Sequence, residues 1–391
     1  MNAHTTDRIV HDADSHIIEP PGWLESYASE YVRDNADAGL IPLDLPILQP
    51  VLERAERRLA GEDPATTEAM KSNLFGHREK YTQWTAYGAH DKAERKNFLD
   101  LTGMSGQLVF PSISWFRVFY SKDMRVQYEG AEAINRGMAD FCSVDERLKS
   151  VGFVPLNDPE RALACVKQGI ELGVSTFWLL TDAVEGRSPA HVDYDPIWAV
   201  MQEAGIPITL HIGSTPRRFP SVYMETGVER VLEGGGLGNL ESTKPHDVPV
   251  LHHSIERWLT AMIYFGVLER FPRLKIGIIE LGANWVPATL MNLDMGVSLL
   301  GKFDQSLKKL SLKPSEYMQR QVRVAPLHTE NTGWILRNVG KEILMFNTDY
   351  PHPEGGSDPF GSFERSLDAV NPTSEELDHF YHKNYESYLG L

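Results

Sequence analysis

Two carboxylates and two imidazoles lie where predicted β-strands end. Asp14 ends the run RIVHDAD, and His16 follows it by two residues. His211 and Asp349 lie near the ends of the runs PITLHI and ILMFNTDY. Polar side chains at the C-terminal ends of apolar parallel strands are where α/β barrels keep their chemistry. Two carboxylates with two imidazoles suit a borderline divalent metal such as zinc or manganese.

Each residue of this set also has a structural interpretation. Asp14 and His16 are two positions apart, which on an extended strand places both side chains on one face; alternatively, Asp14 caps the next helix. His211 precedes Gly213 and a polar loop, which favours an exposed ligand over a packed histidine. Asp349 can bind a metal, accept a proton from metal-bound water, or both, unless it is a turn residue before Pro351.

The elements that must position these residues alternate between strands and helices. Short apolar runs without strict alternation are typical of parallel strands buried on both faces. The eight candidates are Arg8–Asp14, Gln107–Pro111, Ser150–Leu156, Ser175–Leu180, Pro207–Ile212, Leu274–Leu281, Gln321–Leu327 and Ile343–Tyr350. Eight alternations favour an α/β protein with a distorted (β/α)8 TIM barrel, over residues 1–391 as one domain, rather than an open doubly wound sheet.

Amphipathic patterns predict helices over Pro159–Leu172, over Pro196–Ala204 before Gly205, and over Ser254–Phe271 before Pro272. Two stretches fall outside the alternation. Residues 35–97 are charged and helix-prone, and predict a helical insertion after the first strand that forms a lid or a dimer surface. Residues 214–250, after the fifth strand, form a long Gly- and Pro-rich loop suited to substrate binding.

Composition narrows the class of protein. The chain has 391 residues and a net charge of −16, which argues against nonspecific nucleic-acid binding. The two cysteines are too few for a disulfide framework. We find neither a signal peptide nor an apolar run of about 18 residues, so no membrane association is expected. A cytoplasmic enzyme acting on a small molecule is the expectation.

The chain resembles the amidohydrolase superfamily, in particular the branch of 2-amino-3-carboxymuconate-6-semialdehyde decarboxylase and the aromatic acid decarboxylases. The segments that carry the resemblance are DADSHIIEP, DPIWAVMQEAGIPITLHIG, GVLERFPRLKIGIIELGANWVP and FNTDYPHPEG. The resemblance implies a metal-dependent distorted TIM barrel, often dimeric. It places the metal ligands at Asp14, His16, His211 and Asp349.

One position departs from the branch. Where its decarboxylases carry a catalytic histidine, this chain has Glu280. Either Glu280 is itself the general acid or base, or His252 or His253 leans into the site. The structural alternatives are an ion pair between Glu280 and a barrel arginine such as Arg323, and a solvated histidine pair at a helix start.

Four further residues are candidate substrate contacts, each with a second interpretation. Glu19 contacts substrate or orients His16 from outside the metal's ligands. His352 is a substrate contact or a donor that orients a ligand, and His328 follows the seventh strand. Trp178 forms the floor of an aromatic pocket or belongs to the core.

These observations predict a mononuclear metal enzyme that cleaves a C–C bond of a small carboxylate or carbonyl substrate, by non-oxidative decarboxylation or C–C hydrolysis. Zinc is the expected ion, with manganese or iron as alternatives, and the expected assembly is a homodimer. The alternative activity is hydrolysis of an amide, lactam or lactone by metal-bound hydroxide. The third hypothesis is a catalytically silent barrel that binds a partner.

Overall fold

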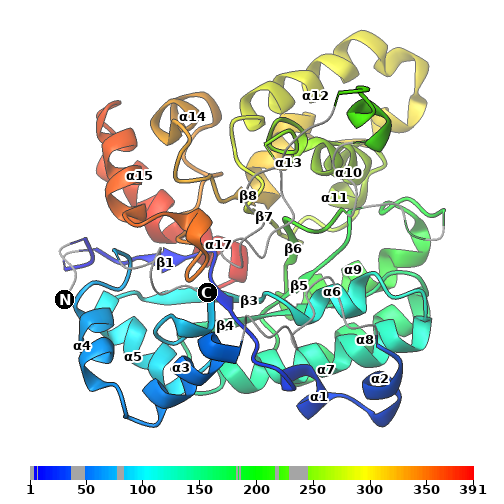
Figure 1. Ribbon diagram of the computed structural model, residues 1–391. Coiled ribbons are helices and arrows are strands. Elements are labelled where there is room, and N and C mark those ends of the chain that lie inside the picture. The colour runs from blue at the N-terminus through cyan, green and yellow to red at the C-terminus, as the bar shows by residue number, and fades with distance from the viewer. Residues whose placement is uncertain are drawn as a thin grey trace.

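A computed structural model describes residues 4–6, 8–36, 49–76, 83–181, 184, 186–215, 220–228 and 245–391. Its strands form one curled parallel sheet, surrounded by helices (Figure 1). The strands are β1 (His11–Asp12), β2 (His16–Ile17), β3 (Gly106–Pro111), β4 (Leu148–Phe153), β5 (Thr176–Trp178), β6 (Ile208–His211), β7 (Ile276–Ile279) and β8 (Val322–Val324). Their order is β1-β3-β4-β5-β6-β7-β8, with β2 also paired to β3.

Residues 343–350 close the ring between β8 and the N-terminal strands. Parallel bridges join Val324 to Leu344 and Ser15 to Tyr350. The amide of Met345 donates to the carbonyl of Val324, and the amide of Asp349 donates to the carbonyl of Asp14. Seven of the eight predicted strands are therefore confirmed, the first being split into β1 and β2, and the eighth, Ile343–Tyr350, is an extended segment joined to its neighbours by isolated bridges only.

Helices follow the strands around the barrel. They are α1 (Trp23–Tyr27), α2 (Glu30–Asn35), α3 (Gln49–Leu59), α4 (Pro64–Ser72), α5 (Lys92–Thr102), α6 (Ser114–Phe119), α7 (Met124–Cys142), α8 (Pro159–Glu171), α9 (Asp195–Ala204), α10 (His253–Tyr264), α11 (Val267–Arg270), α12 (Val286–Leu300), α13 (Pro314–Gln321), α14 (Thr332–Val339), α15 (Pro359–Asp368), α16 (Ser374–Asp378) and α17 (Asn384–Leu389). In the described part of the chain no helix is long and apolar enough to cross a membrane.

Two of the three predicted helices are confirmed and the third is divided. Helices α8 and α9 match, and α9 ends at Gly205, which adopts the left-handed conformation. The prediction of one helix over Ser254–Phe271 is wrong, because Gly266 has φ 74° and separates α10 from α11. A glycine tolerates that conformation without a steric penalty, so the pattern of apolar residues continues across the break.

The described parts of the segment 35–97 are largely helical, as α3, α4 and the start of α5 show. Residues 37–48 and 77–82 lie outside the described residues. Most of the predicted loop 214–250 also lies outside them, so its role in substrate binding stays a prediction.

Helix α17 fills the N-terminal end of the barrel. The hydroxyl of Tyr388 lies 3.0 Å from that of Thr176 and 2.5 Å from that of Thr209, at the beginnings of β5 and β6. Gly277 in β7 is needed there, since a Cβ atom would lie 2.6 Å from the Tyr388 ring. The Tyr388 side chain therefore fills the space between the beginnings of these strands.

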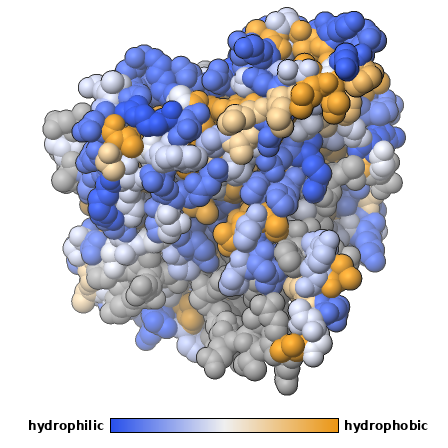
Figure 2. Space-filling view, turned by 90° about the horizontal axis from the view of Figure 1, so that it is seen from above, coloured by the Kyte–Doolittle hydropathy of each residue, from blue (hydrophilic) through white to orange (hydrophobic). Residues whose placement is uncertain are grey.

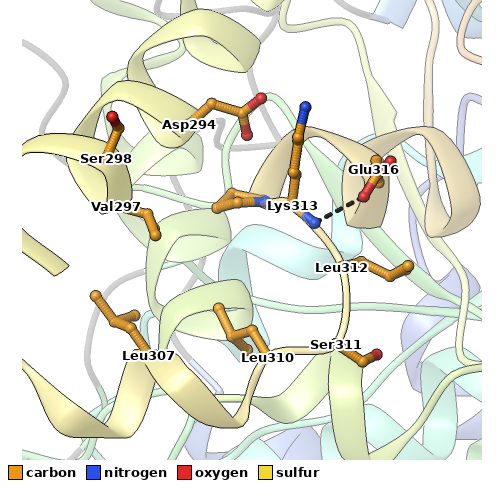
Figure 3. Close-up of a pocket in the computed structure, with 10 residues that line it drawn as sticks. Asp294, Val297, Ser298, Leu307, Leu310, Ser311, Leu312, Lys313 and Glu316 are labelled. Carbon is orange, nitrogen blue, oxygen red and sulfur yellow. Dashed lines mark hydrogen bonds between the residues drawn. The ribbon is translucent and has the colours of Figure 1, made fainter.

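A surface region at the far edge of the barrel is apolar. On α12 and the 3-10 turn η5 (Gly301–Phe303), large side chains are exposed to solvent: Met291, Met295, Leu299, Leu300 and Phe303. Figure 2 shows apolar groups gathered towards one edge of a mostly hydrophilic face. A cavity of about 590 Å³ opens beside α12, lined by Val297, Leu307, Leu310 and Lys313 among others (Figure 3). Its lining shares no residue with the polar strand ends.

Candidate metal centre

The C-terminal end of the barrel brings together four polar side chains from three strand ends. One ligand atom from each of Asp14, His16, His211 and Glu280 lies within 4.8 Å of all the others. Asp14 Oδ1 is 3.3 Å from His16 Nε2 and 3.6 Å from His211 Nε2. Glu280 Oε2 is 3.3 Å from His211 Nε2. All four are buried, and their donor atoms form a group of the kind that can hold a metal ion.

Asp349 adjoins this cluster through His16. Its Oδ1 atom is 3.6 Å from His16 Nε2 and 3.2 Å from His352 Nδ1. The rings of His16 and His352 stack with their centroids 4.1 Å apart. Asp349 thus lies between a candidate metal ligand and a second imidazole, where either predicted role, ligand or proton acceptor, is open to it.

Two carboxylate residues of this site have an unusual backbone. Glu280 has φ 57° and Asp349 has φ 52°, in the left-handed region. A non-glycine residue in this region costs on the order of 1–2 kcal/mol, and such strain gathers at functional sites where the surrounding fold enforces it. Glu280 immediately follows β7, and Asp349 lies in the segment 343–350 that closes the barrel.

The unpartnered atoms of the cluster fit a divalent metal ion. Within the described residues, both carboxylate oxygens of Asp14 and of Asp349 and the Nε2 atoms of His16 and His211 are buried without a hydrogen-bond partner. Unsatisfied buried carboxylates are costly, and a coordinated cation removes that cost. Oxygen and imidazole donors are the ligands that zinc, manganese and iron accept.

Both histidines are prepared to offer a lone pair from Nε2. His211 Nδ1 is 2.9 Å from the carbonyl of Ile212, to which its N–H can donate. Burial, followed by the neighbouring His352 and His211, holds the pKa of His16 well below its ordinary value, so its ring is neutral. Hydrogen bonding of the second ring nitrogen is how proteins fix the tautomer of a ligating histidine.

Ser112 joins the two imidazoles on one side of the mouth. Its hydroxyl lies 3.2 Å from His16 Nδ1 and 2.9 Å from His352 Nε2. The carboxylate of Glu19 accepts hydrogen bonds from the amides of Ser112, Ile113 and Ser114. Glu19 therefore fixes the loop that carries Ser112; its two predicted roles, contacting substrate and orienting His16, stay predictions.

Glu330 plays the same part beside Glu280. It accepts hydrogen bonds from the amides of Ala283, Asn284 and Leu327, and so fixes the loop that follows Glu280. Arg323, the example named for an ion pair with Glu280, is not its partner. The Arg323 guanidinium instead donates to the carbonyls of Gln319 and Val322 and to the Ser387 hydroxyl, because β8 directs it towards α17.

The sequence did not lead us to predict two residues that lie beneath the site. Asp12 is fully buried and accepts hydrogen bonds from Gln107, from the amide and hydroxyl of Thr348 and from the amide of Asp14. Burial raises its pKa to about 7. Arg95 donates to the carbonyls of His16 and Gly88. The alternation of Asp12 with Asp14 and His16 is a sequence pattern that indicates Asp12 as part of the site. Arg95 lies in a helical stretch, and no sequence pattern indicates it.

The remaining predicted residues lie at varied distances from the cluster. Trp178 packs against His211, with ring centroids 4.8 Å apart, and its indole N–H donates to Ser214. His328 Nε2 is 3.0 Å from the carbonyl of Glu354. His253 is exposed on α10, in a separate group with His252 and Glu256. The roles proposed for Trp178, His328 and His253 stay predictions.

Comparison with known proteins places this geometry in context. The family model described as amidohydrolase matches residues 112–390. Decarboxylase orsB of Emericella nidulans is 26% identical over 265 residues, which cover 63% of this chain and 71% of that protein.

Two solved structures have the same fold. An amidohydrolase from Mycobacterium avium subsp. paratuberculosis K-10 has a TM-score of 0.73 at 19% identity, covering 98% of this chain and 100% of that one. The 5-carboxyvanillate decarboxylase LigW2 from Novosphingobium aromaticivorans, with bound manganese, has a TM-score of 0.64 at 17% identity, covering 100% and 99%.

Proposed function

The chain belongs to the amidohydrolase family of metal-dependent enzymes, and on that premise we propose that it is a non-oxidative decarboxylase of a small aromatic carboxylic acid. The observation that carries the proposal is the buried cluster of carboxylates and imidazoles at the barrel mouth, with the Asp349–His352 pair beside it. The similarity to decarboxylase orsB supports this reaction over others of the family.

The predicted ligands Asp14, His16, His211 and Asp349 would hold the metal. We propose zinc first, since it accepts imidazole and carboxylate together, with manganese or iron as alternatives. When bound, the ion supplies Lewis-acid stabilisation of negative charge on substrate oxygens.

The chain's own residues would handle the proton. Decarboxylation breaks the bond between the substrate carbon and its carboxylate, leaves the electron pair on that carbon, and requires one proton in exchange for carbon dioxide. One consistent arrangement has His16 Nδ1–H donating to Ser112, the Ser112 hydroxyl donating to His352 Nε2, and His352 Nδ1–H facing Asp349. Asp349 and His352 could then hold a proton between them and release it to the substrate carbon.

The test is carbon dioxide release by metal-reconstituted protein from a panel of hydroxybenzoic acids, with amides, lactams and lactones of similar size beside it. We expect carbon dioxide and the matching phenol from at least one acid. Metal-free protein and His211→Ala serve as controls. Hydrolysis of an amide or lactone with no carbon dioxide from any acid would replace the proposal by its hydrolytic alternative.

We also propose a cytoplasmic homodimer. Exposed apolar side chains on α12 and η5, such as Met291 at 74% and Phe303 at 76% exposure, support a contact surface there. Sedimentation velocity at micromolar concentration would test it, and a single monomeric species would contradict it.

A further inference from the structure

Arg95 is a fully buried cation on α5, beneath the cluster of candidate ligands. Its Nε atom donates a hydrogen bond to the carbonyl of Gly88 at 2.8 Å, and its Nη2 atom donates to the carbonyl of His16. Its Nη1 atom lies 3.3 Å from the hydroxyl of Ser15 and 3.2 Å from the amide oxygen of Gln107. Each nitrogen of the guanidinium therefore has a partner, and two of the partners, Ser15 and His16, belong to the segment at the end of the first strand.

Gln107, in β3, extends the contact of Arg95 to Asp12. Because the amide oxygen of Gln107 accepts from the guanidinium, its amide nitrogen faces the other way and donates to Asp12 Oδ2 at 2.9 Å. Asp12 also accepts hydrogen bonds from the amide and the hydroxyl of Thr348, at 2.8 and 2.6 Å, and from the amide of Asp14 at 3.2 Å. Asp12 thereby joins the N-terminal strand to the segment that closes the barrel.

The charges of Arg95 and Asp12 support each other across Gln107. The four donors around Asp12 match the acceptor capacity of an ionised carboxylate. Burial raises the pKa of Asp12 to about 7, and these hydrogen bonds oppose that increase. Burial lowers the pKa of Arg95 to about 10, which leaves the guanidinium charged at neutral pH. Isolated buried charges are costly, and a nearby opposite charge offsets part of that cost.

The loop before α5 fixes this helix against the same strand. The amide of Ile18, directly after β2, donates to the carbonyl of Ala89 at 2.8 Å. Gly88 has φ 73°, and a Cβ atom there would lie 2.8 Å from the backbone nitrogen of Arg95. The Arg95 Cζ atom also lies 5.5 Å from the centre of the Tyr350 ring, in the segment that closes the barrel. Helix α5 therefore has a defined position relative to both segments that supply candidate ligands.

We propose that Arg95 is a positioning residue for the metal centre. It contacts the main chain of His16 directly. Through Gln107 and Asp12 it also reaches the segment that carries Asp349. Candidate ligands from the two ends of the sequence thereby keep one spacing. The inference rests on the proposed metal site, and does not depend on the reaction that the site catalyses.

The experiment compares Arg95→Met with Arg58→Met, which removes a second buried arginine from the neighbouring helix α3. The partners of Arg58 are Glu94 and the carbonyl of Ala86, which are not candidate ligands. Co²⁺ is titrated into metal-free full-length protein by calorimetry, and the absorption spectrum of the bound ion reports its coordination. We expect R95M to bind Co²⁺ about 10- to 100-fold more weakly, with a changed spectrum. R58M should lose thermal stability but keep the affinity and the spectrum of the unmodified protein.

An unchanged affinity and spectrum in R95M would overturn the inference. An equal change in R58M would also overturn it, because it would indicate a general loosening of the fold. Thermal unfolding checks that each metal-free protein is folded. If R95M fails to fold, Gln107→Leu carries the test, because it interrupts the path to Asp12 and keeps the contact between Arg95 and His16. A weaker affinity with a changed spectrum in Q107L supports the inference, and unchanged binding overturns it.

The same measurements separate this inference from the proposed function. If the unmodified protein binds no Co²⁺, the proposed metal site is refuted and the inference with it. If it binds Co²⁺ and R95M binds the ion equally well, only the inference is refuted. Absence of carbon dioxide release would refute the decarboxylase function and leave the metal-binding result standing.

Discussion

At the N-terminal end of the barrel, the buried hydroxyl of Tyr388 is shared between Thr176 and Thr209. At the C-terminal end, the buried carboxylate of Asp14 has no hydrogen-bond partner among the described residues. The Tyr388 hydroxyl is thus satisfied by the protein's own groups, whereas the Asp14 carboxylate is not. Since buried polar groups are ordinarily paired, the first contact serves stability and the second is suited to a bound cation.

The largest expected effect comes from removing an imidazole at the C-terminal end. His211→Ala should lose the bound metal, and activity should fall on the order of 10³-fold or more, because several kcal/mol of charge stabilisation disappear. Elemental analysis and the carbon dioxide assay would measure this. His191→Ala, at an exposed histidine outside the site, is the matched control and should retain both; full metal in H211A would remove His211 from the site.

Asp349→Asn removes a carboxylate charge that the proposed site uses both for the metal and for the proton. We expect the metal content to fall and the rate at full metal loading to fall about 10²- to 10⁴-fold, because the proton shared with His352 can no longer be held. Retained turnover with full metal content would exclude Asp349 as the acid or base.

Ser112→Ala should have a smaller effect, because Ser112 acts through His16 and His352. Loss of such an orienting partner typically costs 10- to 100-fold in metal affinity or activity, and we expect a loss in the range of about 10- to 100-fold here. Ser112→Thr, which keeps the hydroxyl, should recover most of it; a failure of S112T to exceed S112A would argue against the hydroxyl as the cause.

At the N-terminal end the expected effect is on stability. Tyr388→Phe removes a hydroxyl shared by two threonines and should lower the free energy of unfolding by about 1–2 kcal/mol. Denaturant titration measures this, and turnover per folded molecule should be unchanged. A loss of turnover without a loss of stability would contradict the assignment of a stabilising role to the N-terminal end of the barrel.

The smallest effect concerns Lys275, which immediately precedes β7 and donates a hydrogen bond to the carbonyl of Arg320. Burial, followed by Arg323 and Arg320, lowers its pKa from 10.5 to about 8. The unfolded chain therefore binds more protons between pH 8 and 10.5, so stability rises with pH across this window and falls as pH decreases through it. Lys275→Met should remove about 1–2 kcal/mol of that dependence. Parallel stability–pH curves for the two proteins would contradict this.

The sequence by itself determined the barrel and most of the site's composition. Apolar runs buried on both faces have a signal that is local to each strand, so seven strands were predictable, and with them the positions of Asp14, His16 and His211. The segment 343–350 that carries Asp349 was predicted as a strand, and it lies beside the barrel strands through isolated bridges. The break at Gly266 was missed because apolar periodicity continues through it.

Only the tertiary structure decided how these residues group. Residues 14, 280 and 349 are far apart in sequence, and their distances depend on barrel curvature and on the left-handed backbone of Glu280 and Asp349. The supports from Glu19, Glu330 and Arg95 consist of contacts to backbone amides and carbonyls, which leave no pattern in side-chain sequence. Ligand type is a property of residues, whereas ligand geometry is a property of the closed barrel.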